Sequence, residues 1–215
     1  ATGLRAQGQN LGKLNFGYDL QLANSGSSSD VRHTEGFNFS YNASVHIRPV
    51  DGMRIMAGFN HDVLPNNEVG MNFHAGDSHS SHNQDYTGEV RMNQLHSSIA
   101  YFGNKWEFLN EFAYIQTRTD SLGKANNFTQ YTYLGYRLKD KFVPYAMFDF
   151  IRMSANELHA KRCQGLKYAL GMRWEIDAQV NLKFQLERYG RFDGIDDVPP
   201  GVRKYEVKFQ LAYVL

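Results

Sequence analysis

Apolar and polar residues alternate through most of this chain. Between residues 37 and 48 every second residue is apolar, and the residues between them are polar: the apolar set is Phe37, Phe39, Tyr41, Ala43, Val45 and Ile47. Successive side chains of a β-strand point to opposite faces, so the pattern predicts strands with one apolar and one polar face. It recurs at approximately 13–22, 36–48, 53–61, 89–102, 105–118, 128–138, 142–152, 165–176, 179–189 and 203–215.

The predicted connections are alternately short and long. The short ones are Pro49–Gly52, Gly103–Asn104, Lys139–Lys141 and Asp177–Ala178, and the long ones are 23–35, 62–88, 119–127, 153–164 and 190–202. Amphipathic strands of about 9–11 residues joined in this way are typical of a transmembrane β-barrel, with short periplasmic turns and long outer loops. We therefore expect residues 1–215 to form an all-β, antiparallel barrel domain of at least ten strands. Ser25, Ser81, Cys163 and Asp196 would lie outside, and Asp51, Gly103, Asp140 and Asp177 would lie in the periplasm.

Five strands fit the alternation almost without exception and so predict which residues meet lipid. Two segments, 89–102 and 128–138, change phase, which predicts a bulge or a part that projects beyond the membrane. On the assigned faces, Leu170→Arg would be harmful and Arg173→Leu mild, because a cation costs free energy on the lipid face. The lipid-facing sets are Leu14, Phe16, Tyr18 and Leu20; Met53, Ile55, Ala57 and Phe59; Tyr168, Leu170, Met172 and Trp174; Val180, Leu182, Phe184 and Leu186; and Tyr205, Val207, Phe209, Leu211, Tyr213 and Leu215.

Aromatic residues gather at both ends of the predicted strands. Amphipathic rings prefer the headgroup level of a bilayer, so two such belts support the barrel. The alternative is a soluble β-sandwich or lipocalin-like barrel, in which the apolar residues point inward. Many large residues on such long strands favour the membrane protein. The short-turn ends carry Tyr101, Trp106, Tyr136, Trp174 and Tyr213, and the long-loop ends carry Phe37, Phe59, Tyr114, Phe150, Tyr168 and Tyr205.

Residues 2–9 also alternate, and Asn10-Leu11-Gly12 has the composition of a short turn. This segment predicts the end of an eleventh strand, an unusual odd number for a bacterial barrel. Either it is a periplasmic stub before a closed ten-stranded barrel, or the chain is the C-terminal part of a larger barrel. We expect the larger barrel.

Composition and charge narrow the class of protein further. A mean hydropathy of -0.52 suits a barrel, because only half of each strand faces lipid. The chain has no apolar run of about 18 residues, as a spanning helix requires. A net charge of +1 gives no reason to expect a nucleic-acid partner. The single cysteine, Cys163, excludes an intramolecular disulfide.

Several short motifs resemble those of bacterial outer-membrane porins of the phosphate-selective O/P-like type and of related general porins. The matching residues are Gly3–Gly8, Leu14–Asn24, Arg48–Met53, Val143–Ala146 with Asp149, and Tyr205–Leu215, where Leu215 replaces the usual terminal Phe. The resemblance implies a passive channel in the bacterial outer membrane, commonly a homotrimer, with more strands than the ten counted from the pattern.

The polar face predicts a lumen of mixed charge. A phosphate-selective channel needs a dense ladder of Arg and Lys, whereas mixed charge favours a weakly selective aqueous lumen, or a plugged one with charges paired across strands. The predicted basic lining is Lys13, Arg48, Arg54, Lys105, Arg137, Lys167, Arg173, Lys183 and Lys208; the acidic lining is Asp19, Glu107, Glu111, Asp149, Glu175, Glu187 and Glu206.

One predicted loop is rich in metal-binding residue types. His74, His79 and His82 lie near Asp77 and Asp85, so they are weak candidates for a metal site. Their spacing matches no established ligand pattern, which favours a polar surface loop. Asp77 and His79 are also residue types that an outer-membrane protease uses at the barrel rim, but no matching pair of Asp residues appears at the top of another predicted strand. We expect no cofactor and no catalysis.

The sequence thus predicts a porin-like channel that passes small hydrophilic solutes or ions across the outer membrane by diffusion. Its expected partners are membrane lipid, the solutes and, in a homotrimer or a larger envelope complex, other chains. The alternative is an occluded structural or adhesive barrel that acts as a scaffold in an envelope complex. Strand number discriminates between them, because about ten strands leave a lumen filled by side chains and about sixteen leave an aqueous channel.

Overall fold

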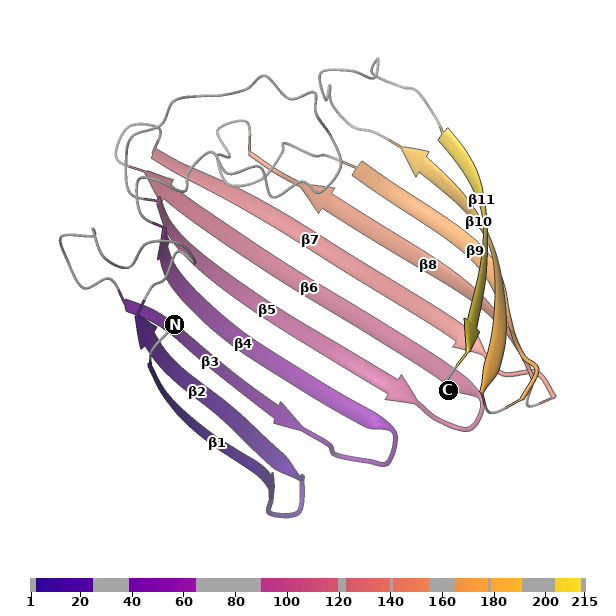
Figure 1. Ribbon diagram of the computed structural model, residues 1–215, viewed down its shortest axis with the longest axis horizontal. Coiled ribbons are helices and arrows are strands. Elements are labelled where there is room, and N and C mark those ends of the chain that lie inside the picture. Colours follow the sequence, from indigo (N-terminus) through magenta and orange to yellow (C-terminus); the bar gives the residue numbers. More distant parts are fainter. Residues whose placement is uncertain are drawn as a thin grey trace.

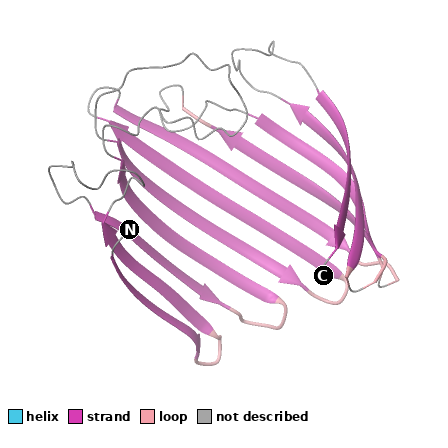
Figure 2. Cartoon of the chain, in the orientation of Figure 1, coloured by secondary structure: helices cyan, strands magenta, loops and turns pink. Residues whose placement is uncertain are grey.

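The computed structural model describes residues 3–24, 39–64, 90–119, 123–139, 141–154, 165–177, 179–190 and 204–213. These residues form one antiparallel sheet of eleven strands in which each strand pairs with its neighbours in chain order (Figure 1). The predicted all-β antiparallel fold is confirmed, and no described residue is helical (Figure 2). The strands are β1 (Gly3–Leu11), β2 (Phe16–Asn24), β3 (Phe39–Ile47), β4 (Met53–Leu64), β5 (Val90–Phe102), β6 (Trp106–Thr119), β7 (Gly123–Tyr136), β8 (Phe142–Arg152), β9 (Gly165–Glu175), β10 (Val180–Gly190) and β11 (Lys204–Tyr213).

The sheet is strongly curved, and β9–β11 turn back at one side of it (Figure 1). The described strands do not close into a ring, because β1 and β11 are the two edges of the sheet and each pairs with one neighbour. The turns that contain Asp51, Gly103 and Asp177 join β3 to β4, β5 to β6 and β9 to β10, at the same end of the sheet. Asp140, Ser25, Ser81, Cys163 and Asp196 lie outside the described residues. No helix among the described residues is long and apolar enough to cross a membrane.

The first strand answers one question that the sequence left open. β1 pairs with β2 from Gly3 to Leu11, with one register shift between Gly8 and Leu11. The turn that follows uses positive φ at Gly12 (65°) and Asn15 (47°), residue types that accept this conformation. The eleventh strand is therefore present. Since β2 pairs with β1 and β3, it has no free edge for β11, and the described strands do not form a closed ten-stranded barrel.

One sequence prediction about the connections was wrong, and one of the two explanations offered for the phase changes is excluded. The predicted long loop at 119–127 is a connection of residues 120–122 only, because β6 and β7 extend toward each other and pair as far as Thr119 and Gly123. No bulge explains the phase changes, since β5 and β7 keep one register with both neighbours. In β7 the change arises because the polar residues Gln130 and Thr132 lie on the apolar face, and in β5 because Val90 and Met92 lie on the polar face.

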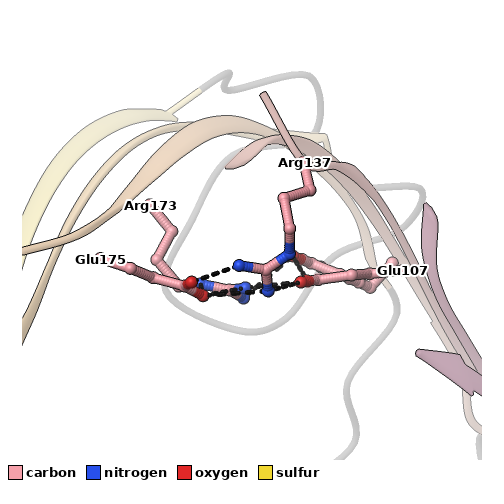
Figure 3. Close-up of polar contacts among 5 residues, drawn as sticks. Glu107, Arg137, Arg173 and Glu175 are labelled. Atoms are coloured by element: carbon pink, nitrogen blue, oxygen red, sulfur yellow. Dashed lines mark hydrogen bonds and ion pairs between the residues drawn. The ribbon is translucent and has the colours of Figure 1, made fainter. Parts of the chain in front are cut away.

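The two faces of the sheet differ in composition, as predicted. Residues directly opposite each other in the register share a face, so one row runs through Leu134, Ala146, Leu170, Leu186 and Val207. We call this apolar face the outer face and the other, which lies on the hollow side of the curved sheet, the inner face (Figure 3). Leu170, for example, is 67% exposed. Every strand residue of the predicted lipid-facing sets lies on the outer face; Leu14 lies in the β1–β2 turn, and Leu215 lies outside the described residues.

Aromatic rings pair on the outer face near both ends of the strands. At the short-turn end, the ring centroids of Trp106 and Tyr136 are 4.7 Å apart and those of Phe142 and Trp174 are 5.7 Å apart. Nearer the long connections, the ring centroids of Phe148 and Tyr168 are 5.4 Å apart. The predicted belts are thus present on the outer face, except for Phe37, which lies outside the described residues.

Polar side chains in the middle of the outer face form hydrogen bonds with each other. Asn110 donates a hydrogen bond from Nδ2 to Thr132 Oγ1 at 2.8 Å, and it also approaches the carbonyl oxygen of Tyr131 at 3.4 Å. Such pairing removes most of the cost of placing a polar side chain in an apolar environment.

Two adjacent serines on β5 test the assignment of the faces. Ser97 lies on the outer face opposite Ala57 and Phe112, and Ser98 lies on the inner face opposite Met56 and Glu111. If a bilayer surrounds the outer face, Ser97→Arg costs about 2–4 kcal/mol of folding free energy and Ser98→Arg close to nothing. Urea titration of the protein folded into lipid vesicles measures both. Equal stabilities of the two variants would show that lipid does not contact the outer face of β5.

Candidate functional site

The inner face holds most of the predicted lumen residues. Arg48 and Arg137 lie just past the ends of β3 and β7. Lys13 and Lys105 do not lie on strands: they occupy the β1–β2 and β5–β6 turns, because these turns begin and end slightly differently from the predicted ones. The inner face of the strands carries Asp19, Arg54, Glu107, Glu111, Asp149, Lys167, Arg173, Glu175, Lys183, Glu187, Glu206 and Lys208.

The most extensive polar contact of the inner face centres on Glu107. Arg173 Nη2 lies 2.6 Å from Glu107 Oε1, and Arg137 Nη2 lies 3.0 Å from the same oxygen. Tyr133 donates its hydroxyl hydrogen bond to Glu107 Oε2 at 2.9 Å. Both arginines also contact Glu175, with Arg173 Nη2 2.7 Å from its Oε1. We call Glu107, Tyr133, Arg137, Arg173 and Glu175 the Glu107 cluster (Figure 3).

The Glu107 cluster joins strands that are not adjacent in the sheet. Glu107 lies on β6 and Arg173 on β9, with β7 and β8 between them. The residue of β7 opposite Glu107 is Gly135, and the hydroxyl of Tyr133 lies in the space that a side chain there would occupy. Glu107 is only 2% exposed. A carboxylate that is buried to this extent requires charged partners, which the two arginines supply.

Arg137 lies just past β7, outside the strand. Its hydrogen bond to Glu175 raises the pKa of the guanidinium above its ordinary value, so Arg137 remains charged. The two arginines balance the two glutamates of the cluster.

A second network continues along the inner face to the edge strand. Lys208 of β11 donates from Nζ to Glu187 Oε2 at 2.7 Å, and its Nζ lies 3.4 Å from Glu206 Oε2. Tyr189 also donates to Glu187, which is 3% exposed. Tyr145 of β8 donates to Gln185 Oε1 at 2.8 Å, and Gln185 donates to Glu187. Polar contacts therefore extend from β8 to β11.

Two simpler ion pairs connect neighbouring strands of the inner face. Lys167 pairs with Asp149 across β8 and β9, where the register places them opposite each other. Arg5 of β1 pairs with Asp19 of β2, with Nε 3.0 Å from Oδ1. Arg54, Glu111 and Lys183 make no ion pair with another described residue. Most of the inner charges are thus neutralised within the wall.

Sequence reasoning missed the tyrosines of the inner face. Tyr133, Tyr145 and Tyr189 each donate to an acceptor in one of the two networks. Tyr145 lies across Gly171 of β9, where a Cβ atom would approach its ring to 2.3 Å. Strict alternation from the outer Phe142 would have placed Tyr145 inward. A tyrosine indicates an inward position less specifically than a charged residue does, because tyrosine also occurs in the aromatic belts.

The candidate metal ligands His74, His79 and His82, with Asp77 and Asp85, lie outside the described residues. Within the part of the chain that the structure describes, no group of three or more His, Cys, Asp or Glu residues could hold a metal ion. His46 and His96 of the inner face lie over Gly17 and Gly58 on the adjacent strands. His61 lies on the outer face, with Nδ1 2.7 Å from Asn93 Oδ1.

The chain matches no protein-family model and no curated protein at a significant level. The geometry therefore carries the functional argument. The sheet has a polar inner face, on which most charges are paired, and an apolar outer face on its other side.

Glu107 and Glu111 provide a matched test of the Glu107 cluster. Both lie on the inner face of β6, but Glu107 accepts hydrogen bonds from three side chains and Glu111 is exposed. Glu107→Gln leaves an excess positive charge in the cluster and is expected to cost about 2–4 kcal/mol of unfolding free energy. Glu111→Gln is expected to cost less than about 0.5 kcal/mol. Urea unfolding measures the difference, and equal costs would contradict a stabilising role of the cluster.

The contacts of Arg173 change what we expect of Arg173→Leu. The sequence alone predicts a mild effect, but the substitution removes a cation that contacts both Glu107 and Glu175. It leaves Arg137 as the remaining cation of the cluster, and a buried carboxylate without its partner is costly. Arg173→Leu is therefore expected to destabilise the protein about as much as Glu107→Gln in the same unfolding assay, whereas Lys183→Leu on β10 should remain mild.

Proposed function

We propose that this protein is a porin-like channel of the bacterial outer membrane, through which small hydrophilic solutes or ions diffuse. The observation that carries the proposal is the separation of the two faces. Large apolar side chains cover the outer face, and aromatic rings pair near its two ends. Charged side chains, together with hydroxyl groups such as that of Tyr133, lie on the concave side (Figure 3). Lipid outside and water inside account for this arrangement.

The two open edges support a barrel with more strands than the structure describes. In a bilayer every backbone N–H and C=O group needs a partner, so β1 and β11 both require a further strand. We infer that additional strands close the ring. About sixteen strands would leave an aqueous lumen, whereas about ten would be filled by side chains. Assembly as a homotrimer, as the porin resemblance implies, or in a larger envelope complex is part of this proposal.

Charge pairing predicts the selectivity of such a channel. Paired charges create a weak field in the lumen, because each cation of an ion pair is offset by a nearby carboxylate. The inner face of the described strands therefore carries no ladder of unpaired cations, which phosphate selectivity would require. We propose a general diffusion channel of low ion selectivity.

Planar-bilayer recordings of the full-length protein test this proposal. We expect stable conductance, modest ion selectivity that falls further as salt increases, and no saturable block by phosphate. Lys183→Glu should shift the reversal potential toward cation selectivity, because it reverses a charge that has no ion-pair partner among the described residues.

The control for Lys183→Glu removes one complete ion pair. Asp149→Asn combined with Lys167→Gln changes no net charge and should leave the reversal potential where it was. Strong anion selectivity with tight phosphate block would instead support the phosphate-selective porin subfamily. Absence of conductance from inserted protein would support the occluded scaffold barrel.

A further inference from the structure

Charged residues are distributed unequally between the two faces of the sheet. Every Asp and Glu of the described strands lies on the inner face. The charged residues on the outer face of these strands are all basic, and all lie toward the long-connection end: Arg91, Arg118, Lys124, Arg152 and Arg188. At the short-turn end, the outer face of the same strands carries rings and aliphatic side chains without charge.

Three of the outer cations form a row across adjacent strands. Arg91 of β5 lies directly opposite Arg118 of β6, and Arg118 lies directly opposite Lys124 of β7. Residues opposite each other in an antiparallel pair have Cβ atoms about 4.5–5.5 Å apart, and like charges in such positions repel. All three residues are exposed, and Arg91 and Lys124 each make a further interaction. We call Arg91, Arg118 and Lys124 the basic row.

The residues below the basic row place it relative to the apolar surface. Two residues from the basic row toward the short-turn end, the outer face carries a polar row of His61, Asn93, Gln116 and Asn126. Two positions further, it carries the apolar row of Phe59, Leu95, Tyr114 and Phe128. At about 3.3 Å per residue, the basic row lies roughly 13 Å along the strands from the apolar row.

The polar row is itself hydrogen-bonded. Asn126 Oδ1 accepts from the Tyr114 hydroxyl at 2.8 Å and from Gln116 Nε2 at 3.1 Å, while His61 contacts Asn93. The outer face of β5–β7 therefore changes from apolar to polar to basic over a few residues. Hydrocarbon, glycerol and phosphate levels follow the same order in a lipid leaflet.

We propose that the basic row binds the phosphate of an anionic lipid in the leaflet at the long-connection end of the barrel. Two guanidinium groups side by side suit bidentate contacts to phosphate oxygens, and the ammonium adds a third donor. The acyl chains of the same lipid would lie along the apolar row, which explains why the cations are on the outer face and not in the lumen. The proposal rests on the membrane placement under the proposed function.

The test compares two triple variants of the full-length protein in lipid. Arg91→Gln, Arg118→Gln and Lys124→Gln together remove the basic row. The control Lys105→Gln, Lys139→Gln and Lys141→Gln removes three cations from exposed turn positions near the opposite end of the strands. Binding of labelled phosphatidic acid is measured by titration into protein held in phosphatidylcholine bilayers.

The basic-row variant is expected to bind phosphatidic acid on the order of 100-fold more weakly. Each of the three cations contributes about fivefold to the affinity, and these factors multiply. The control variant is expected to bind like the native protein. Equal affinities of the two variants would overturn the lipid site. Inorganic phosphate added to protein in zwitterionic detergent distinguishes the source: equivalent binding there, lost in the basic-row variant, would replace the lipid by a free anion.

Conductance separates this inference from the proposed function. The basic row lies on the outer face, so the basic-row variant should conduct like the native protein. Lipid binding that depends on the basic row in a non-conducting protein would leave the lipid site standing and overturn the channel. Failure of the native protein to insert into vesicles would overturn both.

Discussion

The fold depends on one constraint, the pairing of backbone N–H and C=O groups between neighbouring extended strands. That pairing sets the direction of every side chain, because successive residues must point to opposite faces of the sheet. A chain that alternates apolar and polar residues is thereby sorted into two surfaces. The uninterrupted register of β5, β6 and β7 shows how strict this sorting is. Gln130 and Thr132 stay on the outer face because a one-residue slip would bring them inward only by moving all the remaining side chains of β7 to the wrong face as well.

The sorting is most complete for acidic residues, and this explains the form of the inner face. Carboxylates confined to one concave surface repel each other unless cations lie between them. Arg173 and Arg137 lie between Glu107 and Glu175, and Lys208 lies near Glu187 and Glu206. The same pairing that stabilises the wall also weakens its electric field. If solutes pass along this face, as we propose, its weak field would discriminate little between them and would not concentrate one anion.

Much of the fold was predictable from sequence because the period of two is a local property. Both bounds of β8, Phe142 and Arg152, coincide with its predicted segment, and the eleventh strand was visible in the alternation of residues 2–9. The extension of β6 and β7 was not predictable, because Gly123–Asn127 has the composition of a loop. These residues extend β7 by pairing with residues 115–119 of β6. The inward charges were found by the same alternation, except near strand ends such as Lys13, where the turn ends later than predicted and β2 begins only at Phe16.

The Glu107 cluster could not be predicted, because it depends on the curvature of the sheet and not on any local pattern. Strands lie about 4.8 Å apart, so β6 and β9 are separated by roughly 14 Å along the sheet. Glu107 Oε1 and Arg173 Nη2 are nevertheless 2.6 Å apart, since long side chains on a concave surface converge. Gly135 on the intervening β7 leaves room for the Tyr133 hydroxyl, which donates to Glu107. The contact joins β6 to β9 within one wall, so the cluster can stabilise the curvature of the sheet without reaching across its hollow side, where the proposed channel would run.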